Sequence, residues 1–229
     1  MAQNIPINDS VTHNVFLIQV DSSQGTCFII ELKNQEFLVT AKHIFKNAKN
    51  GKERDIILVK QKDVLKFKAK LYIHQDPTID IAVLQLPTQI KHAFPFTTGG
   101  QVKTGQDVYF LGYPSFDNNL FATQDNSFGI LPLVKKAVFS GVRRVNNYYL
   151  TFLDGHNNPG FSGGPIVFYD SFSNRNCIMG IISGYFHESK FTKKGGVPTQ
   201  DYVEENSGII ACYTIELVYQ VVDQNSLVK

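Results

Sequence analysis

Hydrophobic residues along the chain occur in short runs separated by polar and turn-forming residues. In the first part of the sequence the runs are rich in Val, Ile and Phe and follow one another about every ten residues, at 15–20, 27–31, 37–40, 55–60, 64–73 and 80–86. Runs of this length and spacing are typical of strands in an antiparallel barrel or sandwich. Within 64–71 apolar residues alternate with Lys66, Lys68 and Lys70, so these lysines are expected to share one solvent-exposed face.

The pattern restarts after a polar connection at 89–100. A second set of apolar runs lies at 107–114, 129–140, 148–152, 165–169, 177–183 and 207–212. The polar segments 115–127 and 184–206 are predicted to be loops, and long loops in compact domains are often functional. The last apolar positions, at 215, 218, 221 and 222, have helical spacing, which predicts an amphipathic helix over 214–224 that packs on the strands.

The composition is that of a folded domain. Of the 229 residues, 43% are hydrophobic and 18% are charged, which argues against wholesale disorder, and the net charge of +2 predicts no particular partner. The segment 42–70 holds ten Lys or Arg and three acidic residues, but its lysines alternate with apolar residues and no nucleic-acid-binding motif accompanies them. A solvated basic face is therefore preferred to a nucleic-acid partner.

The N-terminus and the cysteines bear on the expected compartment. The first ten residues contain neither a basic leader nor an apolar run, so no signal peptide is expected. No stretch approaches the roughly 20 apolar residues of a membrane span, and no membrane partner is predicted. Cys27, Cys177 and Cys212 are odd in number and lie in apolar runs, which predicts three buried free thiols. Together these features predict a cytoplasmic protein.

A candidate nucleophile lies just before one of the later apolar runs. Residues 156–165 read His-Asn-Asn-Pro-Gly-Phe-Ser-Gly-Gly-Pro, with Ser162 between glycines. Such a serine suggests a hydroxyl held on a tight turn, with nearby backbone N–H groups free to face a ligand. On its own the pattern is also consistent with a turn that merely reverses the chain. A nucleophilic serine needs a base and an orienting acid from elsewhere in the sequence.

Both candidates lie upstream of the serine. His43 follows the short apolar run 37–40, and Asp80 is a single carboxylate at the start of an apolar run. Taken singly, His43 is equally consistent with an ordinary loop histidine, and Asp80 with a turn residue. Asp76 is a second carboxylate nearby, but it precedes Pro77, and the pair is typical of a turn.

Taken together, these residues resemble one protein family. The order His43, Asp80, Ser162, within Val-Thr-Ala-Lys-His, Asp-Ile-Ala-Val-Leu and Pro-Gly-Phe-Ser-Gly-Gly-Pro, resembles the chymotrypsin-fold (trypsin-like) serine proteases, most closely their bacterial HtrA-type branch. The resemblance runs from about residue 25 to residue 215. It implies an all-β fold of two six-stranded antiparallel barrels, at 11–93 and 101–212, followed by the helix 214–224. Residues 1–229 would then form a single peptidase domain without a PDZ domain.

The resemblance also implies a role for each matching residue. His43 would be the general base, Asp80 would fix its tautomer, and Ser162 would be the nucleophile. Asp80 is preferred to Asp76 because Asp80 matches the family motif. The backbone N–H groups of Gly160 and Ser162 would form the oxyanion hole. No metal and no cofactor is predicted.

Substrate-binding residues follow from the same resemblance. Ser183, Gly184 and Tyr185 would pair with the main chain of a bound peptide as an added strand. His156 occupies the position at which trypsins carry the acid that selects basic side chains, so a trypsin-like preference is not expected. Whether His156 faces the specificity pocket or is a loop residue stays open.

The predicted function is a serine endopeptidase that acts on proteins or peptides through an acyl-enzyme. Two alternatives stay open. One is a catalytically silent module that binds peptide, which predicts the loss of a triad member, and none is lost. The other is an esterase or transacylase with the same triad. Phe161 replaces the aspartate that captures the new N-terminus in secreted trypsins, so the loop 157–162 is expected to be ordered from synthesis, or by a regulatory protein partner or oligomer contact. Intrinsic competence with external regulation is preferred.

Overall fold

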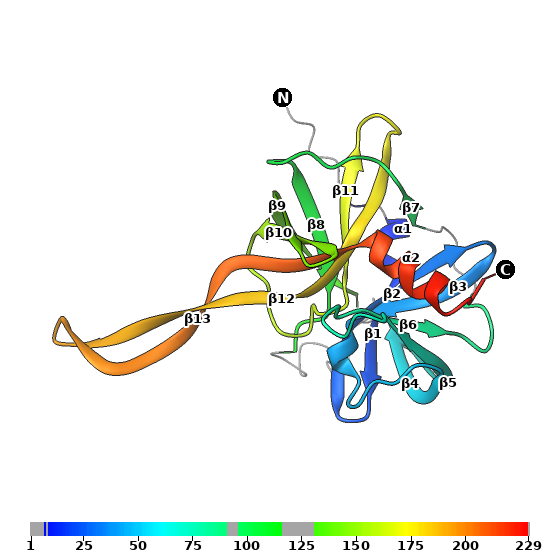
Figure 1. Ribbon diagram of the computed structural model, residues 1–229, viewed down its shortest axis with the longest axis horizontal. Coiled ribbons are helices and arrows are strands. Elements are labelled where there is room, and N and C mark those ends of the chain that lie inside the picture. The colour runs from blue at the N-terminus through cyan, green and yellow to red at the C-terminus, as the bar shows by residue number, and fades with distance from the viewer. Residues whose placement is uncertain (1–6, 8, 91–95, 116–130, 229) are drawn as a thin grey trace.

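The computed structural model of the chain describes residues 7, 9–90, 96–115 and 131–228. Strands dominate these residues, and Figure 1 shows them as two groups with a helix where the groups meet. The predicted loop 115–127 lies outside the described residues after Ser115, and so does the start of the predicted strand 129–140.

The first group of strands forms a closed barrel in the order β1-β2-β3-β6-β5-β4, and every pairing is antiparallel. Two-residue turns set the register of its hairpins. Lys33 and Asn34, for example, have φ of 48° and 62°, the left-handed conformation that a tight β-hairpin turn requires. The strands are β1 Val15–Val20, β2 Ser23–Leu32, β3 Gln35–Thr40, β4 Lys52–Lys60, β5 Asp63–Ile73 and β6 Ala82–Gln85.

The second group closes into a ring of six antiparallel strands, because β11 pairs with both β8 and β12. A short strand, β7 (Thr97–Thr98), pairs in parallel with β12 outside the ring. The predicted fold class is therefore confirmed. The ring strands are β8 Asp107–Gly112, β9 Leu133–Val145, β10 Tyr148–Asp154, β11 Pro165–Asp170, β12 Arg175–Lys194 and β13 Val197–Thr214.

Three apolar cores explain why so many runs are continuously hydrophobic. One fills the first barrel and includes Ile29 and Leu38, and another fills the second ring and includes Phe110 and Ile166. The third joins the two and includes Phe28, whose neighbour Ile29 points into the barrel. Strand β2 is therefore buried on both faces, one against its own barrel interior and one against the second ring.

The predicted C-terminal helix is present as α2, Ile215–Gln224. Its apolar side chains are buried in the core that joins the two groups of strands, and its polar face reaches the first barrel, where Gln220 Oε1 lies 3.0 Å from His74 Nε2. The short helix α1 (Asp9–Thr12) places Val11 in the same core. No helix in the described part of the chain is long and apolar enough to span a membrane.

The prediction that 184–206 is a loop is wrong. Strands β12 and β13 continue their pairing from His187↔Asn206 to Lys194↔Val197, and the resulting hairpin projects away from both groups of strands (Figure 1). Gly195 and Gly196 supply the turn with φ of 61° and 85°. Lys190 bridges Glu188 at 2.9 Å and Glu205 at 2.7 Å, which neutralises charge along the hairpin. We call residues 186–206 the arm.

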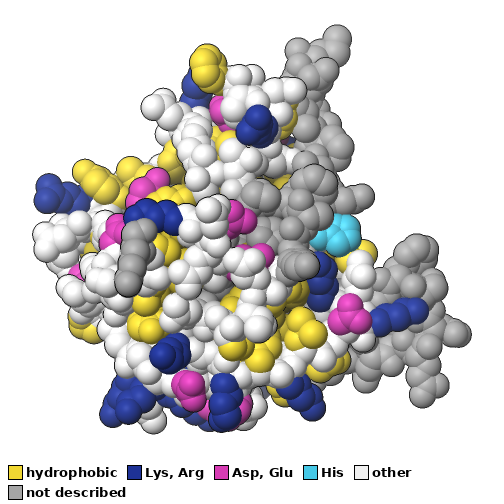
Figure 2. Space-filling model, turned by 90° about the vertical axis from the view of Figure 1, so that its right-hand side faces the viewer, with side chains coloured by type: hydrophobic (Ala, Val, Ile, Leu, Met, Phe, Trp, Pro, Cys, Tyr) yellow, Lys and Arg dark blue, Asp and Glu magenta, His cyan; other side chains and the backbone are white. Residues whose placement is uncertain are grey.

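The basic segment of the first barrel is solvated, as predicted. Lys66, Lys68 and Lys70 are exposed on β5, and Lys68 pairs with Asp55 at 3.1 Å. Figure 2 shows Lys and Arg side chains along the lower edge of this face, interspersed with Asp and Glu. Mixed charges of this kind are typical of a solvent-exposed surface.

The predicted free thiols are also confirmed, because Cys27, Cys177 and Cys212 are unpaired and buried. Burial raises the pKa of Cys27 and Cys212 well above the ordinary thiol value.

Candidate active site

His43 lies in a single 3-10 turn, η1 (Lys42–Ile44), that follows β3 directly. Asp80 holds this residue at two points. Its Oδ1 accepts the backbone N–H of His43 at 2.8 Å, and its Oδ2 lies 2.7 Å from His43 Nδ1. The His43 side chain is 52% exposed and the Asp80 side chain 17%. One mostly buried carboxylate therefore orients an imidazole that remains accessible to solvent.

Electrostatics favour the charged form of the imidazole. The hydrogen bond that His43 donates to Asp80 raises the pKa of His43 above its ordinary value, burial opposes this change, and the charge of Asp80 adds to the increase. Because a carboxylate can only accept, Nδ1 carries the proton in this contact, and Nε2 of the neutral ring is free to accept another. Among the described residues, no group of three or more His, Cys, Asp or Glu side chains could hold a metal ion.

Ser162 connects to this pair through Ser183. The hydroxyl of Ser162 donates to the backbone oxygen of Ser183 at 3.1 Å, and the hydroxyl of Ser183 donates to Asp80 Oδ2 at 2.8 Å. The structure thus brings all three predicted triad residues into one continuous network that spans both groups of strands. In this network the Ser162 hydroxyl is directed at Ser183 rather than at His43.

The side chain of Ser183 is a functional group that the sequence did not identify. The family resemblance had assigned Ser183 a main-chain role in pairing with a bound peptide. Its hydroxyl contact joins residues 103 positions apart, and no motif around Ser183 indicates it. This contact could have been predicted only from the tertiary arrangement, in which β12 of the second ring faces Asp80 of the first barrel.

The turn that carries Ser162 is built from left-handed glycines. Gly160 has φ of 98° and Gly163 has φ of 85°, and a Cβ at either would collide with backbone, at the Tyr113 carbonyl oxygen and the Thr26 carbonyl oxygen respectively. Thr26 of β2 also binds the turn at two points. Its backbone N–H donates to the backbone oxygen of Ser162 at 3.0 Å, and its hydroxyl donates to the backbone oxygen of Gly160 at 2.7 Å. The first barrel therefore holds the turn directly.

Two backbone donors of the turn point to no acceptor. Phe161 N–H closes the turn on the Asn158 oxygen at 3.3 Å, and Gly164 N–H bonds the Phe161 oxygen at 2.9 Å. By contrast, the N–H groups of Gly160 and Ser162 have no acceptor within the described part of the chain. These two N–H groups, the predicted oxyanion donors, are therefore not used by the fold in the described residues.

The structure places some of the predicted substrate-binding residues beside Ser162 and one in an exposed loop. Ser183, Gly184 and Tyr185 are half-buried on β12 beside Ser162, at a point where the ladder with β13 changes register. His156 is exposed in the loop after β10, whereas the next residue, Asn157, is buried with 2% of its surface accessible. No hydrogen bond or ion pair joins His156 to the described residues of the Ser162 network.

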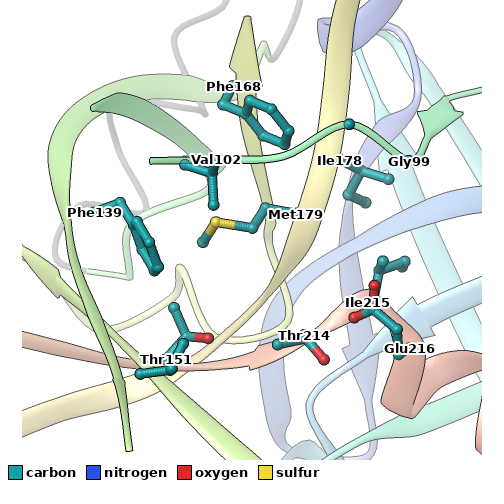
Figure 3. Close-up of a pocket in the computed structure, with 12 residues that line it drawn as sticks. Gly99, Val102, Phe139, Thr151, Phe168, Ile178, Met179, Thr214, Ile215 and Glu216 are labelled. Atoms are coloured by element: carbon teal, nitrogen blue, oxygen red, sulfur yellow. The ribbon is translucent and has the colours of Figure 1, made fainter. Parts of the chain in front are cut away.

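Two hollows of the second ring lie apart from the predicted site residues. A groove of about 680 Å³ runs along the root of the arm and is lined by 140–143, 152–154, Phe186 and 207–209. A smaller cavity of about 170 Å³ lies between the sheet and the start of α2, and Figure 3 shows Phe139, Met179 and Phe168 around it. Neither hollow is lined by a residue of the Ser162 network.

Comparison with protein families gives one match. The model of the trypsin-like peptidase domain matches residues 25–171, a segment that contains His43, Asp80 and Ser162. No curated protein matches the chain.

Solved structures resemble the whole molecule. The Rv3671c protease of M. tuberculosis in an inactive form has a TM-score of 0.59 at 17% identity, over 94% of this chain and 90% of that one. The HtrA-type protease AlgW with a tripeptide has a TM-score of 0.59 at 22% identity over 94% of this chain, which spans 60% of the AlgW chain. A serine endoprotease from Yersinia pestis has a TM-score of 0.60 at 18% identity, over 97% and 68% of the two chains. At these identities the likeness establishes a shared fold.

Proposed function

Because the chain belongs to the family of trypsin-like peptidase domains, we propose that it is a serine endopeptidase that cleaves proteins or peptides. The hydrogen-bonded network of His43, Asp80, Ser183 and Ser162 carries this proposal. It contains a nucleophile, a base and an orienting acid, the groups that acyl transfer requires.

The first step forms the acyl-enzyme. The Ser162 hydroxyl turns from Ser183 to His43, its oxygen attacks the substrate carbonyl carbon, and His43 Nε2 takes the proton. Asp80 stabilises the imidazolium that results. The carbonyl electron pair moves to oxygen, which accepts from the N–H groups of Gly160 and Ser162; each such donor is worth on the order of 3 kcal/mol of barrier. His43 then protonates the leaving amine nitrogen as the C–N bond breaks.

The second step regenerates the enzyme. A water molecule gives its proton to His43 as its oxygen attacks the acyl carbon, and the proton returns to Ser162 as the ester bond breaks. The products are one carboxylic acid and one amine. No cofactor takes part in either step.

A bound peptide would extend along Ser183, Gly184 and Tyr185 as an added strand. The AlgW structure with its tripeptide supports a peptide ligand for this fold. His156 is exposed and carries no acid, so a preference for basic side chains is not expected.

The test compares the wild-type chain with Ser162→Ala. We expect Ser162→Ala to lose hydrolysis by on the order of 10⁴-fold or more with its fold unchanged, because triad members act as a unit. A serine-directed phosphonate should label the wild type and not this variant. The control is Ser171→Ala, which changes an exposed serine in the β11–β12 turn and should behave as the wild type.

Each other outcome favours a different function. Wild-type protein that cleaves peptide without taking up the phosphonate would exclude Ser162 as the nucleophile. Turnover of esters without turnover of peptides would indicate an esterase or transacylase. Peptide binding without turnover of either substrate would indicate a silent binding module.

A further inference from the structure

The oxyanion loop, residues 157–162, contains a buried aromatic side chain, that of Phe161. Phe161 is 1% exposed, and its ring meets that of Phe110 edge-on, with centroids 5.3 Å apart. This packing holds the residue before Ser162 in the core of the second ring. It leaves the earlier part of the loop, Asn157 to Gly160, to be held by other groups.

Lys135 of β9 is one of these groups. Its Nζ donates to Asn158 Oδ1 at 2.7 Å and lies 5.7 Å from the centroid of the Phe161 ring. The side chain is half-buried, and burial lowers the pKa of its ammonium. Its neighbour Lys136 points the other way, as successive strand residues do, and pairs with Asp107 at 2.8 Å on the surface. Lys135 therefore touches both ends of the Asn158–Phe161 turn at once.

Asn206, at the root of the arm on β13, is the second group. Its Nδ2 donates to the backbone oxygen of Asn157 at 2.7 Å, and its Oδ1 accepts the N–H of Gly208 at 2.9 Å. Because both ends of the amide are used, its orientation is fixed. Asn157 is buried, and its own Oδ1 accepts the N–H of Asn158 at 2.9 Å, so the two loop residues are held as one unit.

We infer that Lys135 and Asn206 are positioning residues that hold the oxyanion loop with the N–H groups of Gly160 and Ser162 directed at substrate. The inference rests on the proposed function. Neither side chain belongs to the Ser162 network, so each acts through the loop. Lys135 fixes the first residue of the turn on which Phe161 N–H closes, and Asn206 fixes the residue before it. The left-handed Gly160 then lies between the anchored Asn157 and Asn158 on one side and the buried Phe161 on the other.

The test uses Lys135→Met and Asn206→Asp in the full chain. Asn206→Asp keeps the acceptor for Gly208 and loses the donor to Asn157, so it separates the loop contact from the fold of β13. We expect kcat for a peptide substrate to fall by about tenfold or more in each variant while KM changes less than about twofold, because an oxyanion donor acts in the transition state. Affinity for a peptide boronic acid, which presents an oxyanion, should fall with kcat. Lys135→Arg, which keeps the charge and a donor, should recover most of the activity.

Matched controls lie one residue away from each position. Lys136→Met removes a surface lysine of the same strand, and Glu205→Gln removes an exposed charge at the root of the arm. Both should retain kcat within about twofold. A second readout is amide hydrogen exchange at 157–162, which should accelerate in Lys135→Met and Asn206→Asp and stay unchanged in the controls.

Failure of the inference and failure of the proposed function are distinguishable. If the wild type hydrolyses peptide and both variants match their controls in kcat, the positioning role is overturned and the proposed function stands. If the wild type hydrolyses nothing, the proposed function fails, and unchanged exchange at 157–162 in both variants would still overturn the role of Lys135 and Asn206 in holding the loop.

Discussion

His43 depends on Asp80 for both its orientation and its basicity. The same carboxylate accepts the backbone N–H of His43 and the ring Nδ1–H. Asp76, the other carboxylate nearby, is instead occupied by its own turn, where it accepts the N–H of Thr78 at 2.9 Å and the Thr78 hydroxyl at 2.6 Å. The contacts therefore favour Asp80 as the orienting acid of the proposed mechanism.

The pH dependence of the proposed reaction follows from this pair. His43 must be neutral to act as a base, so kcat/KM should fall tenfold per pH unit on the acid side, with a midpoint above 6.5, because Asp80 raises the pKa. The stability of the fold depends on the protonation of His43 with the opposite sign to kcat/KM. The stabilising contribution of protonated His43 is complete below the unfolded pKa and disappears as the pH rises through the folded pKa.

Substitution of the two carboxylates separates their roles. Asp80→Asn should lower kcat by on the order of 10⁴-fold and shift the acid midpoint down, because the amide removes both the charge and the correct tautomer. Asp76→Asn should leave the midpoint where it is. Rate profiles between pH 5 and 9 measure both, and an unchanged midpoint in Asp80→Asn would exclude this carboxylate as the partner of His43.

At the level of single residues, the sequence identified the groups that sit in motifs. His43, Asp80 and Ser162 each have an ordinary loop or turn explanation when taken singly, and it is their three motifs in this order that resemble one protein family. Lys135 and Asn206 lie in no such pattern. Their contacts cross 23 and 49 positions of the chain and exist because β9 and β13 have a particular register and facing direction. A one-residue shift in either strand would direct these side chains elsewhere.

At the level of elements, the strands of the barrels were predictable and the arm was not. Barrel strands bury apolar residues and appear as hydrophobic runs, whereas most side chains of the arm are exposed and its sequence is polar. The Gly195–Gly196 pair is a hairpin turn signal, but the polar composition of 184–206, rich in Lys, Gly and Glu, led to the loop prediction. Phe191 and Tyr202, paired across the arm, are exposed at 66% and 61%.

Shortening the arm should leave the barrels intact. Replacing 188–205 with an Asn-Gly turn keeps the His187↔Asn206 pair and removes side chains that are mostly exposed. We expect the melting temperature to change by less than about 4 °C and kcat for a short peptide to be retained. A shortening that also removes Asn206 is the comparison, and it should lower kcat. A large loss of stability in the shorter deletion would mean that the arm supports the second ring.

At the level of the whole molecule, the site exists where the two groups of strands meet. Thr26 of the first barrel holds the Ser162 turn of the second ring, and Ser183 of the second ring bonds Asp80 of the first barrel. The family resemblance predicted both barrels, but hydrophobic periodicity alone indicated two sets of strands. Closure of each ring depends on pairings between distant strands, such as β11 with β8, that a local pattern does not contain.

The N-terminus should not act as a switch. The hydrogen bonds between the oxyanion loop and more distant parts of the described chain involve Thr26, Ser115, Lys135, Ser183 and Asn206. We therefore expect the chain with residues 1–10 present to be active, and trimming to Val11 to change kcat/KM by less than about twofold. Activity assays before and after trimming, alone and with candidate partners, measure this. Activity that appears after trimming alone would restore a zymogen-like mechanism.

The way in which the arm is attached also bears on what proteolytic cleavage within it would do to the fold. Both of its strands are rooted in the second ring, β12 through its ladder with β11 and β13 through its ladder with β10. A peptide bond cut at the exposed Gly195–Gly196 tip would leave each half attached by its own ladder. The nicked, two-chain form would keep Ser183 on one piece and Asn206 on the other, both in place. If the chain is an endopeptidase, a cut at this exposed tip by another copy would thus leave the proposed catalytic residues assembled.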